Sequence, residues 1–345
     1  MNCFKILRIL LFKIVIFLLL HHVDAFEPIS TLLGGIILGT GAYYKNSIKD
    51  LTYCQFAECC NDKYVLDITD TLFDSIKQEL FGQHIANDIL SKAIIAHTAK
   101  VNANISKKPL VISLHGTPGT GKNFVSEILI RSMYKKGKDS AFVHKFLGRS
   151  DFPIESNVNE YKIEINRIVR EKVKMCPKSL FIFDEVDKMP AGIFESIASL
   201  LDHHSMLNGL DFSKAIFIFL SNTGGVEISE TLTQLTKNGK WRDDTKLYDF
   251  EKILEIGSYN LDGGLKKTSL IESHLVDHFV PFLPLERKHI RLCLEKEYFK
   301  WGQFPKESDV SEIIDKFITF DKQTGMYATS GCKTLGAKVA VYVRS

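Results

Sequence analysis

Short apolar runs divide the middle of the chain into candidate strands. The runs at 109–116, 179–189 and 215–222 consist mainly of apolar residues up to a terminal glycine or polar group, and 141–148 is a fourth candidate. Continuous apolar runs of this length are typical of strands that are buried on both faces of a parallel sheet. The pattern predicts an α/β fold with a central parallel sheet flanked by helices.

Helical spacing appears after the first run and again near the C-terminus. Phe124 and Ile128 lie on one face of a predicted helix that ends at Gly137. The segments 285–302 and 309–320 are also amphipathic at helical spacing. They predict a small helical domain at the end of the chain.

The N-terminus has the pattern of a targeting segment. Residues 1–25 combine basic residues with an apolar run that ends at Leu20, and Val23 and Ala25 follow at cleavage spacing. This predicts a secretory signal peptide, with a retained signal anchor as the alternative. The uncharged stretch Pro28–Tyr44 is too short for a comfortable crossing, so we expect it to lie in or dip into a lumenal leaflet. The alternative is an N-terminal helix packed on the domain.

Charge and cysteine content narrow the class of protein. The chain of 345 residues has a net charge of +3 and no long basic run, so nucleic acid is not an expected partner. Of seven cysteines, Cys3 leaves with the signal peptide, and a secreted compartment permits disulfides among the others. Asn104 begins an Asn-Ile-Ser sequon, which predicts glycosylation on a surface loop in the endoplasmic reticulum.

The glycine-rich loop after the first run predicts a phosphate-binding site. Strand, loop and helix follow in the order in which backbone amides and a helix N-terminus hold phosphate oxygens. Lys122 would neutralise the outer phosphates. The alternative is a structural glycine turn without a ligand. The predicted nucleotide-binding residues are Gly116, Thr117, Pro118, Gly119, Thr120, Gly121, Lys122 and Asn123.

Polar side chains end the later strands at the edge where parallel sheets bind ligands. We predict that Asp184 holds Mg²⁺, directly or through water, and that Glu185 polarises the attacking water. Asn222 is placed to orient that water and to touch the γ-phosphate of ATP. The alternative is a pair of carboxylates that are satisfied within the core.

Together, these elements resemble the AAA+ ATPases of the Clp type and, more narrowly, the torsin family. The phrases that support the resemblance are EPIS, YCQFAECC, LFGQH, SLHGTPGTGKNFVS, SLFIFDEVDKM, KAIFIFLSN, SLIESHLVDHFVPFLPLE and GCKT. They extend from Glu27 to Thr334, whereas the last ten residues do not share the resemblance. The family implies an ATPase of the endoplasmic reticulum and nuclear envelope lumen, peripherally associated with the membrane, with ATP and Mg²⁺ as cofactors. The expected division is a signal peptide 1–25, a membrane-associating segment 26–45, a large ATP-binding domain 46–285 and a small C-terminal helical domain 286–345.

The resemblance also assigns roles to individual residues. Lys122 belongs to the Walker A motif, and Asp184 and Glu185 belong to Walker B. Asn222 is the sensor 1 residue, and Lys333 is the sensor 2 residue. The catalytic set implied for this chain is therefore Glu185, Asn222 and Lys333.

Two departures from other AAA+ chains predict slow intrinsic turnover. Asn123 replaces the Ser or Thr hydroxyl that binds magnesium, although an amide oxygen can also bind a hard cation. Leu275 stands where Clp-type chains carry an arginine finger, and Arg242 and Arg287 only flank this region. The family implies self-association and an activator that supplies the arginine. This activator is the lumenal domain of a lamina-associated transmembrane protein.

Two cysteine pairs are disulfide candidates. Cys54 and Cys176 each lie in a torsin-like phrase and would close a long loop, with two buried free thiols as the alternative. Cys293 lies on a lid helix and Cys332 is next to Lys333, so a disulfide there would shift Lys333 and change nucleotide affinity. The alternative for this second pair is simple packing.

Two functions remain open on the sequence. One is a partner-activated ATPase that remodels protein or membrane assemblies. The other is a non-catalytic, ATP-dependent binding switch in which Asn123 is a sign of lost catalysis. Glu185 favours the enzyme, because a pure switch has no need of a catalytic carboxylate.

Overall fold

The computed structural model describes residues 54, 57–68, 71–203, 206–322 and 324–343. The predicted signal peptide and the segment Pro28–Tyr44 lie outside these residues. None of the helices in the described part has the length and apolar character needed to span a membrane. The chain divides after Cys59 into two units, and the second contains every predicted nucleotide-binding residue.

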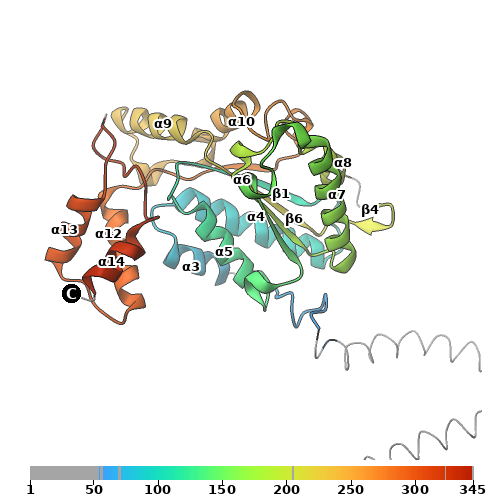
Figure 1. Cartoon of the computed structure of the whole chain (residues 1–345), viewed down its shortest axis with the longest axis horizontal. Coiled ribbons are helices and arrows are strands. Elements are labelled where there is room, and N and C mark those ends of the chain that lie inside the picture. The colour runs from blue at the N-terminus through green and yellow to red at the C-terminus, as the bar shows by residue number, and fades with distance from the viewer. Residues whose placement is uncertain (1–53, 55–56, 69–70, 204–205, 323, 344–345) are drawn as a thin grey trace, which may run out of the picture. The chain divides into compact units, whose positions relative to one another are not determined.

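A five-stranded sheet forms the centre of the second unit (Figure 1). Its strands are β1 (Leu110–His115), β2 (Val143–Leu147), β3 (Leu180–Asp184), β6 (Ile216–Ser221) and β7 (His278–Pro281). They lie in the order β2-β3-β6-β1-β7, and every neighbouring pair is parallel. β1, β3 and β6 are buried along their whole length, whereas the edge strand β2 is partly exposed. The predicted α/β fold with a central parallel sheet is confirmed.

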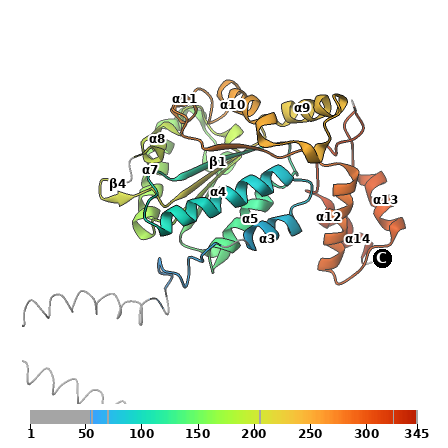
Figure 2. The ribbon, with the colours of Figure 1, turned by 180° about the vertical axis from the view of Figure 1, so that it is seen from behind.

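Helices cover this sheet and form a second apolar core near the C-terminus. They are α3 (Thr71–Glu79), α4 (His84–Asn102), α5 (Lys122–Met133), α6 (Gly148–Asp151), α7 (Val158–Met175), α8 (Glu195–Leu201), α9 (Gly225–Lys237), α10 (Glu251–Asn260), α11 (Ser269–Glu272), α12 (Arg287–Lys300), α13 (Glu307–Phe317) and α14 (Leu335–Tyr342). Figure 2 shows α3, α4 and α5 side by side. α12, α13 and α14 pack around their own cluster of buried residues, which includes Ile290, Leu294 and Ile313. We refer to this group of three helices as the lid.

Three phenylalanines fix the register of the strands that end at the predicted site. Phe146, Phe183 and Phe219 stand at paired positions on β2, β3 and β6, and successive rings stack with centroids 4.6 and 5.1 Å apart. All three side chains are buried. Because side chains alternate across a strand, Lys145 and Asp184 point to the opposite face of the sheet. The aromatic stack thus holds the carboxyl ends of these strands in one line.

The cysteines around residue 60 pair differently from the sequence prediction. Cys54 is bonded to Cys59, with Cα atoms 5.5 Å apart, and Cys60 is bonded to Cys176, with Cα atoms 5.2 Å apart. The predicted Cys54–Cys176 disulfide is therefore wrong, although both cysteines are in disulfides. Adjacent side chains point apart, so Cys59 and Cys60 reach different partners. Sequence spacing cannot tell which of three nearby cysteines reaches Cys176.

The disulfide between Cys60 and Cys176 should be the more stabilising of this pair of bonds. It spans 116 positions, whereas the Cys54–Cys59 bond spans five, and a longer loop loses more unfolded-state entropy on closure. We expect the double variant Cys60→Ser, Cys176→Ser to lose about 2–4 kcal/mol in free energy of unfolding. Urea titration under non-reducing conditions measures this loss. The matched control is Cys54→Ser, Cys59→Ser, and an equal loss in that control would contradict the prediction.

Candidate functional site

The glycine-rich loop between β1 and α5 has the backbone that phosphate binding requires. Gly119 and Gly121 have φ angles of 80° and 109°, in the half of conformational space that favours glycine. The hydroxyl of Thr120 donates to the carbonyl of Thr117 at 2.8 Å, which closes the loop on itself. α5 begins directly after the loop, so the unpaired backbone amides of its first turn and the positive end of its helix dipole lie beside the loop. The loop is therefore suited to an anion.

Lys122 is the buried cation of this loop. Its ammonium group donates to the carbonyls of Gly116 and Thr117 at 2.5 and 3.0 Å and to Oδ1 of Asn222 at 3.2 Å. Burial lowers the pKa of Lys122 to about 8, although nearby aspartates favour the charged form. The structure thus brings together the predicted Walker A lysine and the predicted sensor 1 residue.

Asp187 is a site residue that the sequence analysis did not single out. It lies in the short 3₁₀ helix Val186–Lys188 that follows β3. Its Oδ1 accepts hydrogen bonds from the backbone N–H of Asn222 at 3.0 Å and from Nδ2 of the same residue at 3.4 Å. These bonds orient the amide so that its oxygen faces Lys122. The available signal was the third acidic residue in the phrase DEVDKM.

Glu185 stands on a strained turn at the end of β3. Its φ and ψ angles are 57° and 46°, a left-handed conformation that is uncommon for residues other than glycine. A Cβ atom on Gly148 would lie 2.4 Å from the Glu185 carbonyl oxygen, so only glycine allows this approach. The Glu185 side chain is 38% exposed, and Nε of Arg149 is 3.7 Å from its carboxylate. Glu185 is therefore presented to solvent beside Asp184, as a residue that activates water requires.

The predicted metal ligands Asn123 and Asp184 also meet. Nδ2 of Asn123 is 3.3 Å from Oδ1 of Asp184. Lys145, which the sequence analysis passed over, places its ammonium group 2.8 Å from Oδ1 of Asn123 and 2.9 Å from Oδ2 of Asp184. Across the described ranges, no three His, Cys, Asp or Glu side chains form a metal-binding group. A carboxylate and an amide oxygen nevertheless fit Mg²⁺, which keeps several water ligands.

A loop of the lid touches the phosphate-binding loop. The backbone N–H of Cys332 donates to the carbonyl of Gly119 at 3.1 Å, and a Cβ on Gly119 would lie 1.9 Å from the carbonyl oxygen of Ser330. Cys332 is bonded to Cys293 on α12, with Cα atoms 6.2 Å apart, so the second candidate pair is a disulfide in this structure. The side chain of Lys333, the predicted sensor 2 residue, is exposed one position further on. Its role stays a prediction.

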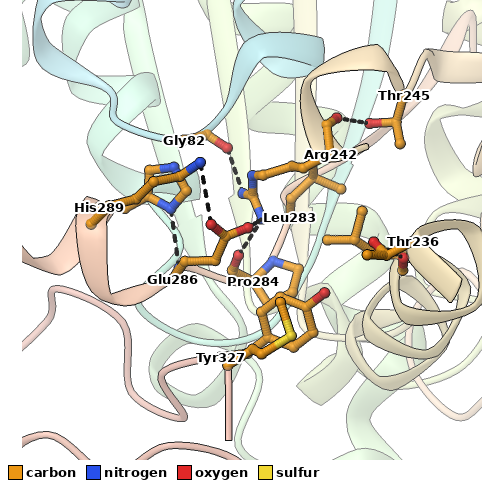
Figure 3. A network of polar contacts seen from close by, with 12 residues as sticks. Gly82, Thr236, Arg242, Thr245, Leu283, Pro284, Glu286, His289 and Tyr327 are labelled. Carbon is orange, nitrogen blue, oxygen red and sulfur yellow. Dashed lines mark hydrogen bonds and ion pairs between the residues drawn. The ribbon is translucent and has the colours of Figure 1, made fainter. Parts of the chain in front are cut away.

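A buried arginine joins the large domain to the start of the lid (Figure 3). Arg242 donates to the carbonyls of Pro284 at 2.8 Å and Gly82 at 2.7 Å, and it forms an ion pair with Glu286 at 3.3 Å. The residue is only 6% exposed. Because its guanidinium is used within the chain, Arg242 is not available to a neighbouring subunit. Arg287 pairs at the surface of the lid with an aspartate.

Gln83, in the phrase LFGQH, ties the phosphate-binding loop to the chain after β7. Its side chain donates to the carbonyls of Thr120 at 3.1 Å and Leu283 at 2.8 Å, and it accepts from the N–H of Leu283 at 2.8 Å. Nearby, burial and then the charge of Arg242 lower the pKa of His289 to about 4. His289 is therefore neutral near pH 7. Its Nδ1 accepts from the backbone N–H at the start of the lid. These contacts couple the lid to the loop.

The chain is similar to proteins of one family over most of its length. A family model described as Torsin matches residues 54–183. A torsin-like protein of Drosophila melanogaster is 49% identical over 315 residues, which cover 90% of each chain. A torsin-like protein of Caenorhabditis elegans is 37% identical over 306 residues, which cover 88% of this chain and 85% of the relative.

Solved structures of Hsp104 share the fold. The S. cerevisiae Hsp104–ADP complex gives a TM-score of 0.52 at 16% identity, over 79% of this chain and 48% of that chain. A closed-state reconstruction of Hsp104 with ATPγS and FITC casein gives a TM-score of 0.50 at 14% identity. The match covers 79% of this chain and 46% of that chain. This chain matches about half the length of those chains. At such low identity the likeness shows the fold alone, and it confirms the predicted AAA+ architecture.

Proposed function

This chain belongs to the torsin family, and from that premise we propose that it is an ATP hydrolase of the AAA+ class with a chaperone-like role. The proposal rests on one observation. Lys122, Asn222, Asp184 and Glu185 meet beside the glycine-rich loop, where the parallel strands end. Lys122 and the loop amides bind the phosphates, while Asn222 and Glu185 orient and activate water. Mg²⁺, held by Asn123 and Asp184, adds charge neutralisation when it is bound.

We propose further that hydrolysis needs an activator. Leu275, at the position of the Clp-type arginine finger, is only 5% exposed, and Arg242 is bonded within the chain. Neither position offers a guanidinium to a neighbouring copy of this chain. The partner that fits is the lumenal domain of a lamina-associated transmembrane protein, docked beside the nucleotide and supplying an arginine. Self-association of this chain belongs to the same proposal.

ATP turnover by the purified mature chain, with and without that activator domain, tests the proposal. We expect slow turnover alone and a rise on the order of 10³-fold with the activator, at the low end of what arginine fingers contribute in phosphoryl transfer. An activator whose arginine is replaced by alanine should give no rise. Turnover that stays at background with the intact activator would refute an ATP hydrolase.

A non-catalytic, ATP-dependent switch is the second candidate. Two observations favour it. Arg149 lies near the carboxylate of Glu185, and the ammonium group of Lys145 contacts both predicted metal ligands. Either group would slow hydrolysis if it stayed in place with ATP bound. The same turnover measurement separates the two functions, because a switch binds ATP but gives no rise with the activator.

The proposed location is the lumen of the endoplasmic reticulum and the nuclear envelope, at the membrane surface. Asn104, the sequon residue, is exposed just after α4, where a glycan can attach. We expect the segment 28–44 to supply membrane attachment. After its deletion, carbonate extraction of membranes should release the chain into the soluble fraction. The released chain should still bind ATP. Carbonate-resistant attachment after the deletion would contradict this role.

The disulfide between Cys293 and Cys332 is proposed as a redox switch. It anchors the lid loop whose Cys332 N–H bonds to Gly119, so reduction should loosen that contact and change nucleotide affinity. We expect a change of about 3- to 10-fold in ADP affinity between reducing and oxidising buffer, equivalent to about 0.6–1.4 kcal/mol. Calorimetric titration of the parent measures it, and Cys332→Ser should remove the difference. Identical affinities in both buffers for the parent would leave Cys332 as a packing residue.

A further inference from the structure

The ammonium group of Lys145 occupies the point where the predicted magnesium ligands converge. It lies 2.8 Å from Oδ1 of Asn123 and 2.9 Å from Oδ2 of Asp184. Nδ2 of Asn123 is in turn 3.3 Å from Oδ1 of Asp184, so each of the three side chains contacts the other two. Three separate elements contribute to it: β2, the first turn of α5, and the end of β3.

The fold places Lys145 there by strand register. Lys145 is paired with Ile182 on β3, and Asp184 is two positions further along the same face. The neighbouring Phe146 is stacked on Phe183 in the core, which anchors β2 and turns Lys145 to the other side. The Lys145 side chain is 38% exposed and that of Asp184 12% exposed. The ammonium is therefore held in position beside the phosphate-binding loop and keeps access to solvent.

Hydrogen-bond donors already occupy the oxygens that would bind a metal ion. Both Asn123 Oδ1 and Asp184 Oδ2 accept from Lys145, and Asp184 Oδ1 accepts from Asn123 and from the N–H of Glu185 at 2.9 Å. Magnesium binds its ligands at about 2.0–2.1 Å. An ion on the same two oxygens would therefore lie a few ångströms from the ammonium, where like charges repel strongly. Magnesium and Lys145 compete for one place.

We propose that Lys145 is a tethered cation of the nucleotide site that takes over part of the charge neutralisation of Mg²⁺, so that ATP binding depends only weakly on divalent metal. The inference rests on the proposed function, since it presumes that the loop binds ATP. In the absence of metal, Lys145 and Lys122 together provide two positive charges at the loop. In the presence of metal, displacement of Lys145 reduces the gain in affinity that Mg²⁺ gives.

The test compares ATP affinity in Mg²⁺ with ATP affinity in EDTA, by calorimetry on the mature chain. For the parent we expect the ratio of the two affinities to stay within about threefold. For Lys145→Met and Lys145→Gln we expect a ratio larger by about tenfold or more, because metal-free binding weakens and the competitor for the metal is gone. Lys145→Arg, which keeps the charge, should stay close to the parent. The control Lys92→Met removes a lysine that pairs with Asp88 on the exposed face of α4, and it should change nothing.

A second measurement reads the metal directly. Mn²⁺ titrated into the ATP complex and followed by electron paramagnetic resonance should bind about tenfold more tightly to Lys145→Met than to the parent. Equal Mn²⁺ affinity and an unchanged Mg²⁺/EDTA ratio in the variants would overturn the inference while leaving ATP binding intact. A parent that fails to bind ATP in either buffer would overturn the proposed function itself.

Discussion

Replacing Lys122 by alanine is expected to reduce ATP affinity by at least about 100-fold, equivalent to about 2.7 kcal/mol. The reason is that Lys122 is a buried cation aimed into the glycine-rich loop by two carbonyls and Asn222. Without it, the loop keeps its backbone amides but loses the buried positive charge that faces the phosphates. Calorimetric titration with ATP measures the loss, and Lys92→Ala on the exposed face of α4 is the matched control. Unchanged affinity in Lys122→Ala would refute the loop assignment.

The pH dependence of binding separates the charge of Lys122 from its packing. Burial lowers its pKa to about 8 in the free protein, so the ammonium loses its proton as the pH rises through that value. ATP phosphates favour the charged form and raise this pKa on binding. Affinity should therefore be fully present below pH 8 and fall above it, by at most about tenfold per pH unit. Lys122→Ala should show no such fall, and a fall of the same size in that variant would assign it to another group.

Replacing Glu185 by glutamine is expected to lower ATP turnover with the activator by about 10²–10⁴-fold, the range that general bases contribute. The amide keeps the size of the side chain but cannot take a proton from water. Binding should stay within about threefold of the parent, because Glu185 has no contact with the phosphate-binding loop among the hydrogen bonds and ion pairs of the described residues. Single-turnover kinetics and nucleotide titration measure the two quantities.

The complex between Glu185→Gln and the activator should persist, since ATP is bound but not hydrolysed. Gel filtration with ATP detects this complex. The control is Glu171→Gln on the exposed face of α7, where Glu171 pairs only with Arg167 in the structure's salt bridges and hydrogen bonds, and it should turn over ATP like the parent. An equal loss of ATP affinity and turnover in Glu185→Gln would mean that Glu185 supports the structure of the site.

Much of the nucleotide site could be predicted from the sequence because its signals are local. A glycine-rich loop between an apolar strand and a helix needs only neighbouring residues to take its shape, and the φ angles of Gly119 and Gly121 agree with that expectation. Parallel strands also bring their carboxyl ends to one edge whatever their order. Asp184, Glu185 and Asn222 could therefore be placed together before the order of strands was known.

Residues that act across the sheet could not be predicted in this way. Asp187 reaches Asn222 only because β3 and β6 are neighbours, and Lys145 reaches Asp184 only because β2 pairs with β3 in one register. A shift of one residue would turn Lys145 into the core and Phe146 toward the site. The spacing of residues along the chain does not indicate in which register β2 pairs with β3.

The sequence by itself determined the parallel sheet and the phosphate-binding loop, because apolar periodicity and glycine placement act over a few residues. The family followed from the resemblance of longer phrases such as LFGQH and GCKT to the torsins. Only the tertiary structure decided which cysteine forms a disulfide with Cys176. It also decided that Arg242 is hydrogen-bonded within the chain and that Lys145 contacts the predicted metal ligands. Each of these depends on side chains that are distant in sequence and meet through packing. Their meeting is decided by strand order and register, which arise from burial of the whole core.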